Sequence, residues 1–205
     1  ALLRTPLSMA QYLDSRPIAL PLRLYDCVMP CAGADGFLVM RRRRANTLGL
    51  RSARILASIE RHNAFPDDPV QWRAGWAMDR DALWDTAGIG PLEINCVQTY
   101  DDYPVIVMMQ FQDLGFCNID EGPDFIRRHD FTIGGSFPNN TGGGQLSCGQ
   151  AGAAGGFLGV VEALRQVTGA AGERQVAGAR HALASGFGMI NYDRGLCTAA
   201  AVLGA

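Results

Sequence analysis

The apolar positions of this chain form short runs separated by glycine, proline and charged residues. Four runs have the length and composition of β-strands, and they cover residues 53–59, 94–99, 182–187 and 196–203. We expect the first of them to be mostly buried. The last two flank a polar loop at 188–195, and they therefore predict a hairpin.

Helical patterns alternate with these runs. The strongest is an apolar helix over 105–114, which Pro104 opens and Gly115 ends. Further helices are predicted at 8–15, 79–87 and about 153–168. Since strands and helices alternate in the middle of the chain, the sequence predicts an α/β fold with a mixed sheet and helices on at least one face.

The first third of the chain is less regular. Residues 1–25 are interpreted as a connecting arm, and residues 26–40 as a strand hairpin that turns at 33–36. The basic run at 41–44 is typical of a solvated loop, although it also has the charge to attract an anion. Residues 62–78 hold aromatic side chains among prolines and acids, and we expect an irregular excursion there rather than a core element.

Composition and charge exclude several classes of function. The chain has 205 residues, 48% of them hydrophobic and 19% charged, which is enough apolar material for a substantial core. The net charge of −2 gives no general attraction to nucleic acid or to an anionic membrane surface. No apolar run approaches the ~20 residues of a membrane-spanning helix. We therefore expect a cytoplasmic protein without nucleic-acid or membrane partners.

The six cysteines are scattered, and a chain of this size does not need a disulfide framework. Cys27 and Cys31 have C-x3-C spacing, but no second cysteine or histidine pair follows at the spacing of a zinc finger. We expect reduced thiols, no metal site and no bound cofactor.

The segment 140–156 is the most informative part of the sequence. It holds seven glycines in seventeen residues and runs into a predicted helix N-terminus, where free N–H groups favour negative charge. The G-x-G-x-x-G fingerprint is missing, and Gln150 stands where a phosphate loop has lysine. The segment is either a ligand-binding loop or a place where helix and sheet pack closely.

Two further segments carry polar side chains at strand ends, Thr99–Pro104 and 189–195. The first lies between a strand and a helix, which is where α/β sheets bind ligands. Its two carboxylates point in different directions in extended backbone, and Asp102 is alternatively a helix cap. The second contains Asn191 and Tyr192, and it is either part of a site or a solvated turn.

Taken in order, these segments resemble the C-terminal half of the thiolase superfamily, specifically its lipid-transfer or sterol-carrier-type branch. Four strings carry the resemblance, and they lie at Gly33–Val39, Ala87–Asn95, Gly115–Gly122 and Asn140–Gly149. The last is the most specific, because it matches the family pattern N-x-x-G-G-x-L-S-x-G-H-P up to the histidine. The resemblance implies a thiolase-like layered fold without its N-terminal half. Residues 1–44 would belong to that half, and residues 45–205 would form the C-terminal domain.

The departures from the family pattern concern its catalytic positions. Gln150 replaces the histidine that assists the nucleophilic cysteine, and glutamine cannot transfer a proton. Tyr100 stands at an active-site asparagine or histidine position, and Cys197 is expected inside a strand. The nucleophilic cysteine belongs to the other half, and Cys148 is interpreted as structural. Ordinary thiolysis is therefore not expected.

The resemblance implies carbon–carbon bond cleavage or formation of the aldolase type on an acyl-CoA thioester. Tyr100 and Tyr192 are the candidate general acid and base, and Gln150 is the candidate donor to the thioester oxygen. The predicted substrate-binding residues are Asp101, Tyr103, Gly143, Gly144, Gly149 and Asn191. The alternatives are thiolase-type acyl transfer, a non-catalytic acyl-CoA or lipid-binding protein, and a structural half-subunit.

The implied partners follow from the same family. They are an acyl-CoA, the N-terminal thiolase half on the same or a separate chain, a second copy in a homodimer, and a zinc-ribbon/OB-fold protein. Coenzyme A thioester enters as substrate and not as a bound cofactor. Because this half supplies only one wall of the site, we expect the 205-residue chain alone to catalyse nothing.

Overall fold

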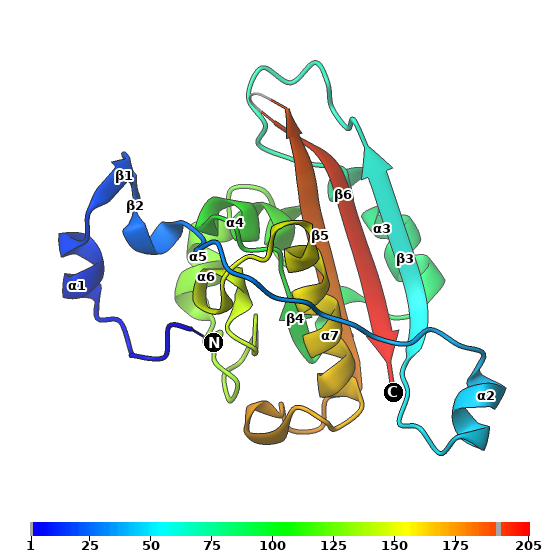
Figure 1. The fold of residues 1–205 in the computed structure, drawn as a ribbon. Coiled ribbons are helices and arrows are strands. Elements are labelled where there is room, and N and C mark those ends of the chain that lie inside the picture. Colours follow the sequence, from blue (N-terminus) through cyan, green and yellow to red (C-terminus); the bar gives the residue numbers. More distant parts are fainter. Residues whose placement is uncertain (1, 192–193) are drawn as a thin grey trace.

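The computed structural model describes residues 2–191 and 194–205. Its centre is a four-stranded sheet in the order β3-β6-β5-β4 (Figure 1). The strands are β3 (Arg54–His62), β4 (Cys96–Gln98), β5 (His181–Asn191) and β6 (Arg194–Gly204). β4 runs parallel to β5, and the other two pairs are antiparallel. The predicted α/β class with a mixed sheet is confirmed.

Helices cover both faces of this sheet. α7 (Gly155–Val167) lies on one face over β4 and β5, whereas α3 (Trp76–Ala87) lies on the other face against β3 and β6 (Figure 1). α4 (Pro104–Asp113) packs beside α3. All three helices were predicted to within a few residues, and Gly88 ends α3 in the left-handed conformation.

Two apolar clusters fix the helices on the sheet. The larger joins α3 and α4 to the sheet, and its fully buried members are Trp76, Leu83, Leu114, Leu183 and Val202. The smaller lies under α7, where Ala163 and Val167 pack against Cys96 and Leu203. No helix in the described part of the chain is long and apolar enough to cross a membrane.

Trp76 corrects the expectation that residues 62–78 lie outside the core. It is completely buried, its ring stacks on Phe187 at 5.7 Å between centroids, and its Nε1 donates a hydrogen bond to the Ala199 carbonyl at 2.9 Å. The stretch before it is irregular as predicted. The tryptophan belongs to the core because it begins α3 and so faces the sheet.

Two strand predictions also need correction. β3 is an edge strand and is mostly exposed, with Ile55 61% accessible, although it was expected to be mostly buried. The polar loop expected at 188–195 is strand wherever it is described, because β5 and β6 remain paired as far as Asn191 and Arg194. Residues 192–193 lie outside the described ranges.

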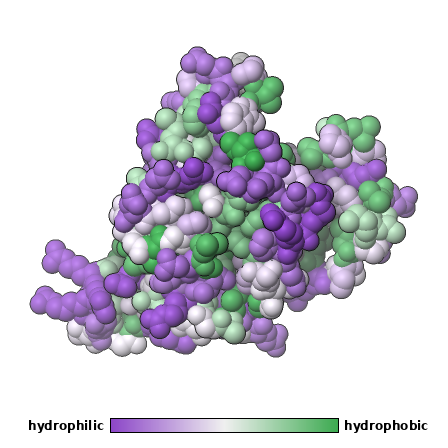
Figure 2. Space-filling view, turned by 180° about the vertical axis from the view of Figure 1, so that it is seen from behind, coloured by the Kyte–Doolittle hydropathy of each residue, from purple (hydrophilic) through white to green (hydrophobic). Residues whose placement is uncertain are grey.

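The N-terminal arm projects from the body of the molecule as a lobe with apolar residues on its surface (Figures 1 and 2). As observed, the arm runs as far as Cys31, beyond the predicted residues 1–25, and it contains α1 (Met9–Asp14), β1 (Pro17–Ala19), β2 (Leu22–Arg23) and the 3-10 turn η1 (Leu24–Asp26). The helix expected at 8–15 is confirmed, and Ser8 caps it.

The hairpin predicted at 26–40 is wrong, since the described structure has no strand in that range. Met29 and Cys31 pair instead with Gln150, and Phe37 packs on Phe157 of α7. The basic run continues into the short helix α2 (Arg42–Thr47) rather than staying in a loop. Whether residues 1–44 belong to another half remains a prediction.

The remaining short helices lie near the glycine-rich segment or in connections. They are α5 (Gly122–Arg128), α6 (Gly144–Cys148), and the 3-10 turns η2 (Pro91–Glu93), η3 (Gly152–Ala154) and η4 (Gly172–Arg174). α6 was not predicted, because it has only five residues and follows two consecutive glycines in a segment expected to be a loop. It nevertheless shapes the site described next.

Candidate active site

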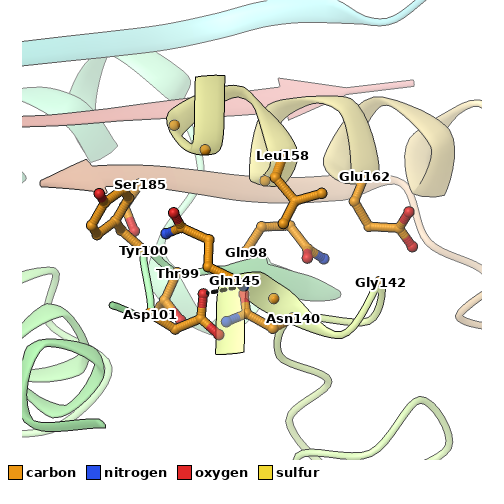
Figure 3. Close-up of a pocket in the computed structure, with 14 residues that line it drawn as sticks. Gln98, Thr99, Tyr100, Asp101, Asn140, Gly142, Gln145, Leu158, Glu162 and Ser185 are labelled. Carbon is orange, nitrogen blue, oxygen red and sulfur yellow. Dashed lines mark hydrogen bonds between the residues drawn. The ribbon is translucent and has the colours of Figure 1, made fainter. Parts of the chain in front are cut away.

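The carboxyl end of β4 meets the glycine-rich segment beside the N-terminal end of α7. The Asn140 N–H donates to the Val97 carbonyl at 2.9 Å, so the segment is attached to the strand by main-chain hydrogen bonds. A pocket opens at this junction, lined by residues of β4, α6 and α7 (Figure 3). Its position agrees with the rule that α/β sheets bind ligands at the carboxyl ends of their strands.

Beside this pocket, Gln150 joins two side chains of the segment that follows β4. Its Nε2 donates to the Tyr100 hydroxyl at 2.8 Å and to Asp102 Oδ1 at 3.0 Å. The structure therefore brings together two predicted catalytic residues, Tyr100 and Gln150, which are 50 positions apart in the chain. Asp102 is not a cap of α4, whose N-cap residue is Tyr103 without a side-chain bond.

The environment of Tyr100 keeps its hydroxyl protonated near neutral pH. Burial, together with the nearby negative charge of Asp102, raises the pKa of Tyr100 to about 12. Burial also raises the pKa of Asp102, while a hydrogen bond from Tyr100 opposes that shift. At neutral pH Tyr100 thus keeps its proton, and Asp102 is a stronger base than an exposed aspartate.

The backbone of Tyr100 is held by a buried amide. Gln110 of α4 donates from Nε2 to the Tyr100 carbonyl at 2.8 Å, and its Oε1 accepts from the Tyr100 N–H at 2.9 Å. Ser185 of β5 donates to the same Oε1 at 2.5 Å. Gln110 is fully buried, so α4 and β5 together fix the position from which Tyr100 reaches the site.

Asp101 has a different partner from Asp102, as the extended backbone predicted. Its carboxylate accepts from the N–H groups of Gln145 and Leu146, at 2.7 and 3.4 Å, at the start of α6. The approach is so close that a Cβ on Gly144 would lie 2.0 Å from Asp101 Oδ2. Burial raises the Asp101 pKa to about 6. Its role in the structure is to anchor α6.

A buried polar network that could not be identified from the sequence ties the glycine-rich segment to α7. The Thr141 hydroxyl donates to Glu162 Oε1 at 3.0 Å and accepts from Gln98 and Gln166 at 3.1 and 3.0 Å. Arg174 pairs with the Glu162 carboxylate at 3.0 Å. Glu162 is almost fully buried, and this pairing compensates its charge.

Gln145 is a second residue that sequence reasoning missed. It is 2% exposed, and within residues 2–191 and 194–205 its Oε1 is the buried side-chain polar atom without a hydrogen-bond partner. Figure 3 shows the side chain extending into the pocket toward Tyr100 and Ser185. A buried acceptor without a partner is costly, so this position suits a single donor group, from a water molecule or a ligand, in an enclosed space of about 10 Å³.

The N-terminal arm holds the main chain of Gln150 in place. The Gln150 N–H donates to the Met29 carbonyl at 2.7 Å, and the Cys31 N–H donates to the Gln150 carbonyl at 3.0 Å. Gly149 is glycine for a steric reason, since its φ is 89° and a Cβ would lie 2.8 Å from Cys31 Sγ. The arm therefore sets the position of Gln150.

The other predicted substrate-binding residues are more dispersed. Gly143 precedes α6 with a φ of 106°, and Tyr103 is partly buried against the larger core cluster rather than lining the pocket. Asn191 is exposed at the end of β5, near the tip of the hairpin and away from α6 (Figure 1). The predicted catalytic residue Tyr192 lies outside the described residues.

The two cysteines discussed from the sequence are now placed. Cys148 donates from Sγ to the Gly142 carbonyl at 3.1 Å, inside the glycine-rich segment. That contact agrees with a structural role. Cys197 lies within β6, as predicted, and not in a loop at the site.

Fold and site together define a layered α/β domain of the thiolase-like class, with a polar site at the junction of strand, glycine-rich segment and helix. The comparisons with known proteins agree. The chain belongs to the family described as Thiolase C-terminal domain-like, which matches residues 73–200. The resemblance stated from the sequence is thereby confirmed.

Individual relatives come from the same superfamily. A 17-hydroxy-3-oxo-4-pregnene-20-carboxyl-CoA lyase of Mycobacterium tuberculosis is 30% identical over 208 residues, which are 97% of this chain and 51% of the lyase. Sterol carrier protein 2 of Rattus norvegicus is 27% identical over 190 residues, 89% of this chain and 35% of that protein. A solved structure, "Ltp2-ChsH2(DUF35) aldolase", matches with a TM-score of 0.79 at 27% identity over 98% of this chain and 52% of its own. The chain thus spans about half the length of such relatives or less.

Proposed function

We propose that this domain supplies the acid–base wall of an enzyme that cleaves or forms a carbon–carbon bond in an acyl-CoA thioester, by aldol chemistry. The observation that carries the proposal is the hydrogen-bonded group of Tyr100, Asp102 and Gln150. A thiolase needs a histidine to assist its cysteine, and glutamine at that position cannot move a proton. A tyrosine that keeps its proton can supply it.

The chemistry assigns a task to each member of the group. In the cleavage direction, a base takes the hydroxyl proton of a β-hydroxyacyl thioester and the Cα–Cβ bond breaks. The products are a carbonyl compound and the enolate of the shorter thioester, which then takes a proton at Cα. Tyr100 is the proposed donor of that proton, and Asp102 the proposed base. Tyr192, predicted from the sequence, is the alternative base.

The role proposed for Gln150 differs from the one predicted. Its amide group already donates to Tyr100 and to Asp102, so it has no free N–H for a thioester oxygen. We infer that Gln150 chiefly orients the tyrosine hydroxyl and the carboxylate. Donation to the thioester would require the substrate to displace one of these hydrogen bonds.

The pocket also suggests how a substrate is held. The unpartnered Gln145 Oε1 would accept from an N–H or hydroxyl of the acyl-CoA, and Asp101 and Gly144 keep α6 in place around it. Gly143, Gly149, Tyr103 and Asn191 remain proposed binding residues. The partners proposed with this site are an N-terminal thiolase half, a second copy and a zinc-ribbon/OB-fold protein.

The test uses the complete protein with its missing half and a β-hydroxyacyl-CoA substrate, and it measures both products by chromatography. We expect Tyr100→Phe to lower kcat by about 10²- to 10⁴-fold with little change in substrate binding, because it removes the transferred proton and leaves the ring. Asp102→Asn and Tyr192→Phe compare the two candidate bases. Tyr25→Phe is the matched control, since Tyr25 is exposed in the arm.

Near wild-type turnover in Tyr100→Phe would exclude the proposed acid. Tight acyl-CoA binding without any bond cleavage in the wild-type protein would favour the non-catalytic, lipid-binding alternative, which the similarity to sterol carrier protein 2 keeps open. Acyl transfer to free coenzyme A, in place of aldol cleavage, would favour the thiolase alternative.

A further inference from the structure

Three side chains with metal-ligand atoms meet at the exposed edge of the sheet, on strands β3 and β6. Glu60 and His62 are two residues apart on β3, so they project from the same face of the sheet. Cys197 is the cross-strand partner of His62 on β6, and its side chain therefore lies on that face as well. The antiparallel register, rather than any loop, brings the three together.

The donor atoms converge on a single point. Glu60 Oε1 lies 2.5 Å from His62 Nε2, and Cys197 Sγ lies 3.7 Å from the same nitrogen. The ligand atoms of the three residues all lie within 4.8 Å of one another. No other set of three such residues in the described part of the chain converges in this way.

The geometry distinguishes a metal site from a catalytic triad. In a triad, the acid orients the histidine through one ring nitrogen while the nucleophile contacts the other. Here the carboxylate and the thiol both approach Nε2. One nitrogen cannot relay a proton between them, whereas oxygen, nitrogen and sulfur around one point form a coordination set.

From this convergence, we propose that Glu60, His62 and Cys197 bind a divalent transition-metal ion of the zinc class. Zinc takes carboxylate oxygen and imidazole nitrogen at about 2.0–2.2 Å and thiolate sulfur at about 2.3 Å, so tetrahedral ligands lie roughly 3.5 Å apart. The nitrogen–sulfur distance of 3.7 Å is already close to that value. The oxygen must move away from the nitrogen by about 1 Å, which the long and exposed Glu60 side chain permits.

Space for a fourth ligand is available on the same face. The residue paired with Cys197 on its other side is Gly188 of β5, where an added Cβ would meet nothing within 4 Å. Glu60 also borders a hollow over β5 and β6, next to α7. A site with three protein ligands and one open position is the arrangement of reactive rather than purely structural zinc. The proposal is independent of the role given to Tyr100.

The experiment measures metal binding to the complete protein after treatment with a chelator. Zinc binding by calorimetry is expected to show one site per chain. Cobalt(II) at the same site is expected to give the intense near-ultraviolet absorption of thiolate ligation and the visible bands of tetrahedral coordination. His62→Ala, Cys197→Ser and Glu60→Gln should each weaken zinc binding at least about 10-fold, since even the loss of an outer-sphere partner costs that much.

Matched controls are His181→Ala and Cys117→Ser, which remove a histidine and a cysteine elsewhere and should leave zinc binding unchanged. Two of the three ligand positions lie on the edge strand β3 and the third on its neighbour β6, and melting curves of each variant will show that it is folded. Equal zinc affinity in the wild type and all three variants would overturn the proposal. So would a cobalt spectrum without thiolate absorption in the wild-type protein.

Discussion

Asp113 gives the sharpest quantitative test of the structure. It ends α4, is 2% exposed, and accepts a hydrogen bond from the Ala74 N–H at 2.6 Å. Burial raises its pKa to about 7, although the hydrogen bond from Ala74 and the charges of Arg80 and Arg73 oppose that shift. The carboxyl group thus holds the segment before Trp76 to the end of α4.

The sign of the pH effect follows from the raised pKa. An unfolded aspartate has a pKa of about 3.9, so between about pH 4 and pH 7 the folded protein binds a proton that the unfolded chain has lost. The contribution of Asp113 to stability is therefore greatest below pH 4 and falls as the pH rises to 7. With a folded pKa of about 7, the fall between pH 5 and pH 8 is roughly 2–3 kcal/mol.

The perturbation is Asp113→Asn, which keeps an acceptor for the Ala74 N–H and removes the titration. Urea unfolding of both proteins at pH 5 and pH 8 gives the two stability differences. We expect the free energy of unfolding of the variant, relative to that of the wild type, to rise by roughly 2–3 kcal/mol between pH 5 and pH 8. As a control, Asp79→Asn should show a constant difference, because the hydrogen bond from Arg61 lowers the pKa of Asp79 and its titration ends below pH 5.

A stability difference between Asp113→Asn and wild type that is the same at both pH values would refute the reasoning. It would mean that the buried carboxyl is ionised throughout this range. A variant whose stability relative to wild type falls between pH 5 and pH 8 would refute it equally, since ionisation of Asp113 would then favour the folded state.

Two further predictions concern packing. Gly144→Ala should destabilise the protein more than Gly88→Ala. Both glycines have a positive φ, of 60° and 69°, but only a Cβ at position 144 would lie 2.0 Å from Asp101 Oδ2. Gly88→Ala should cost about 1–2 kcal/mol, and equal losses of stability in urea unfolding would contradict the close contact at Gly144. Trp76→Ala should cost about 3–5 kcal/mol by the same method, and a loss below about 1 kcal/mol would show that this side chain is not in the core.

Features set by neighbouring residues could be predicted from the sequence. The helix between Pro104 and Gly115 is defined by the proline that begins it, the glycine that follows it and the apolar residues between them. The β5–β6 hairpin is defined by two apolar runs. The position of the candidate site at the end of β4 followed from the alternation of strands and helices. In each case the cause is local, and tertiary contacts only adjust the ends of the element.

Features that depend on contacts between distant residues could not be predicted from the sequence. Residues 37–40 have the composition of a strand, but the nearby chain pairs with Gln150 instead of with them. The group of Tyr100, Asp102 and Gln150 depends on the path of the glycine-rich segment, and His62 and Cys197 are 135 positions apart. Spacing along the chain carries no signal for pairs that only the sheet register or the fold brings together.

The hydrogen bonds from the arm to Gln150 also affect how the protein should be divided. The match to the family domain begins at residue 73, yet the main-chain groups of Met29 and Cys31 hold the glutamine from a part of the chain well before that point. A shortened protein cut at the similarity boundary would keep every strand of the main sheet except β3, and would leave Gln150 without its two main-chain anchors. The boundary of the matched family domain therefore falls inside the unit that must be kept together to move the site intact.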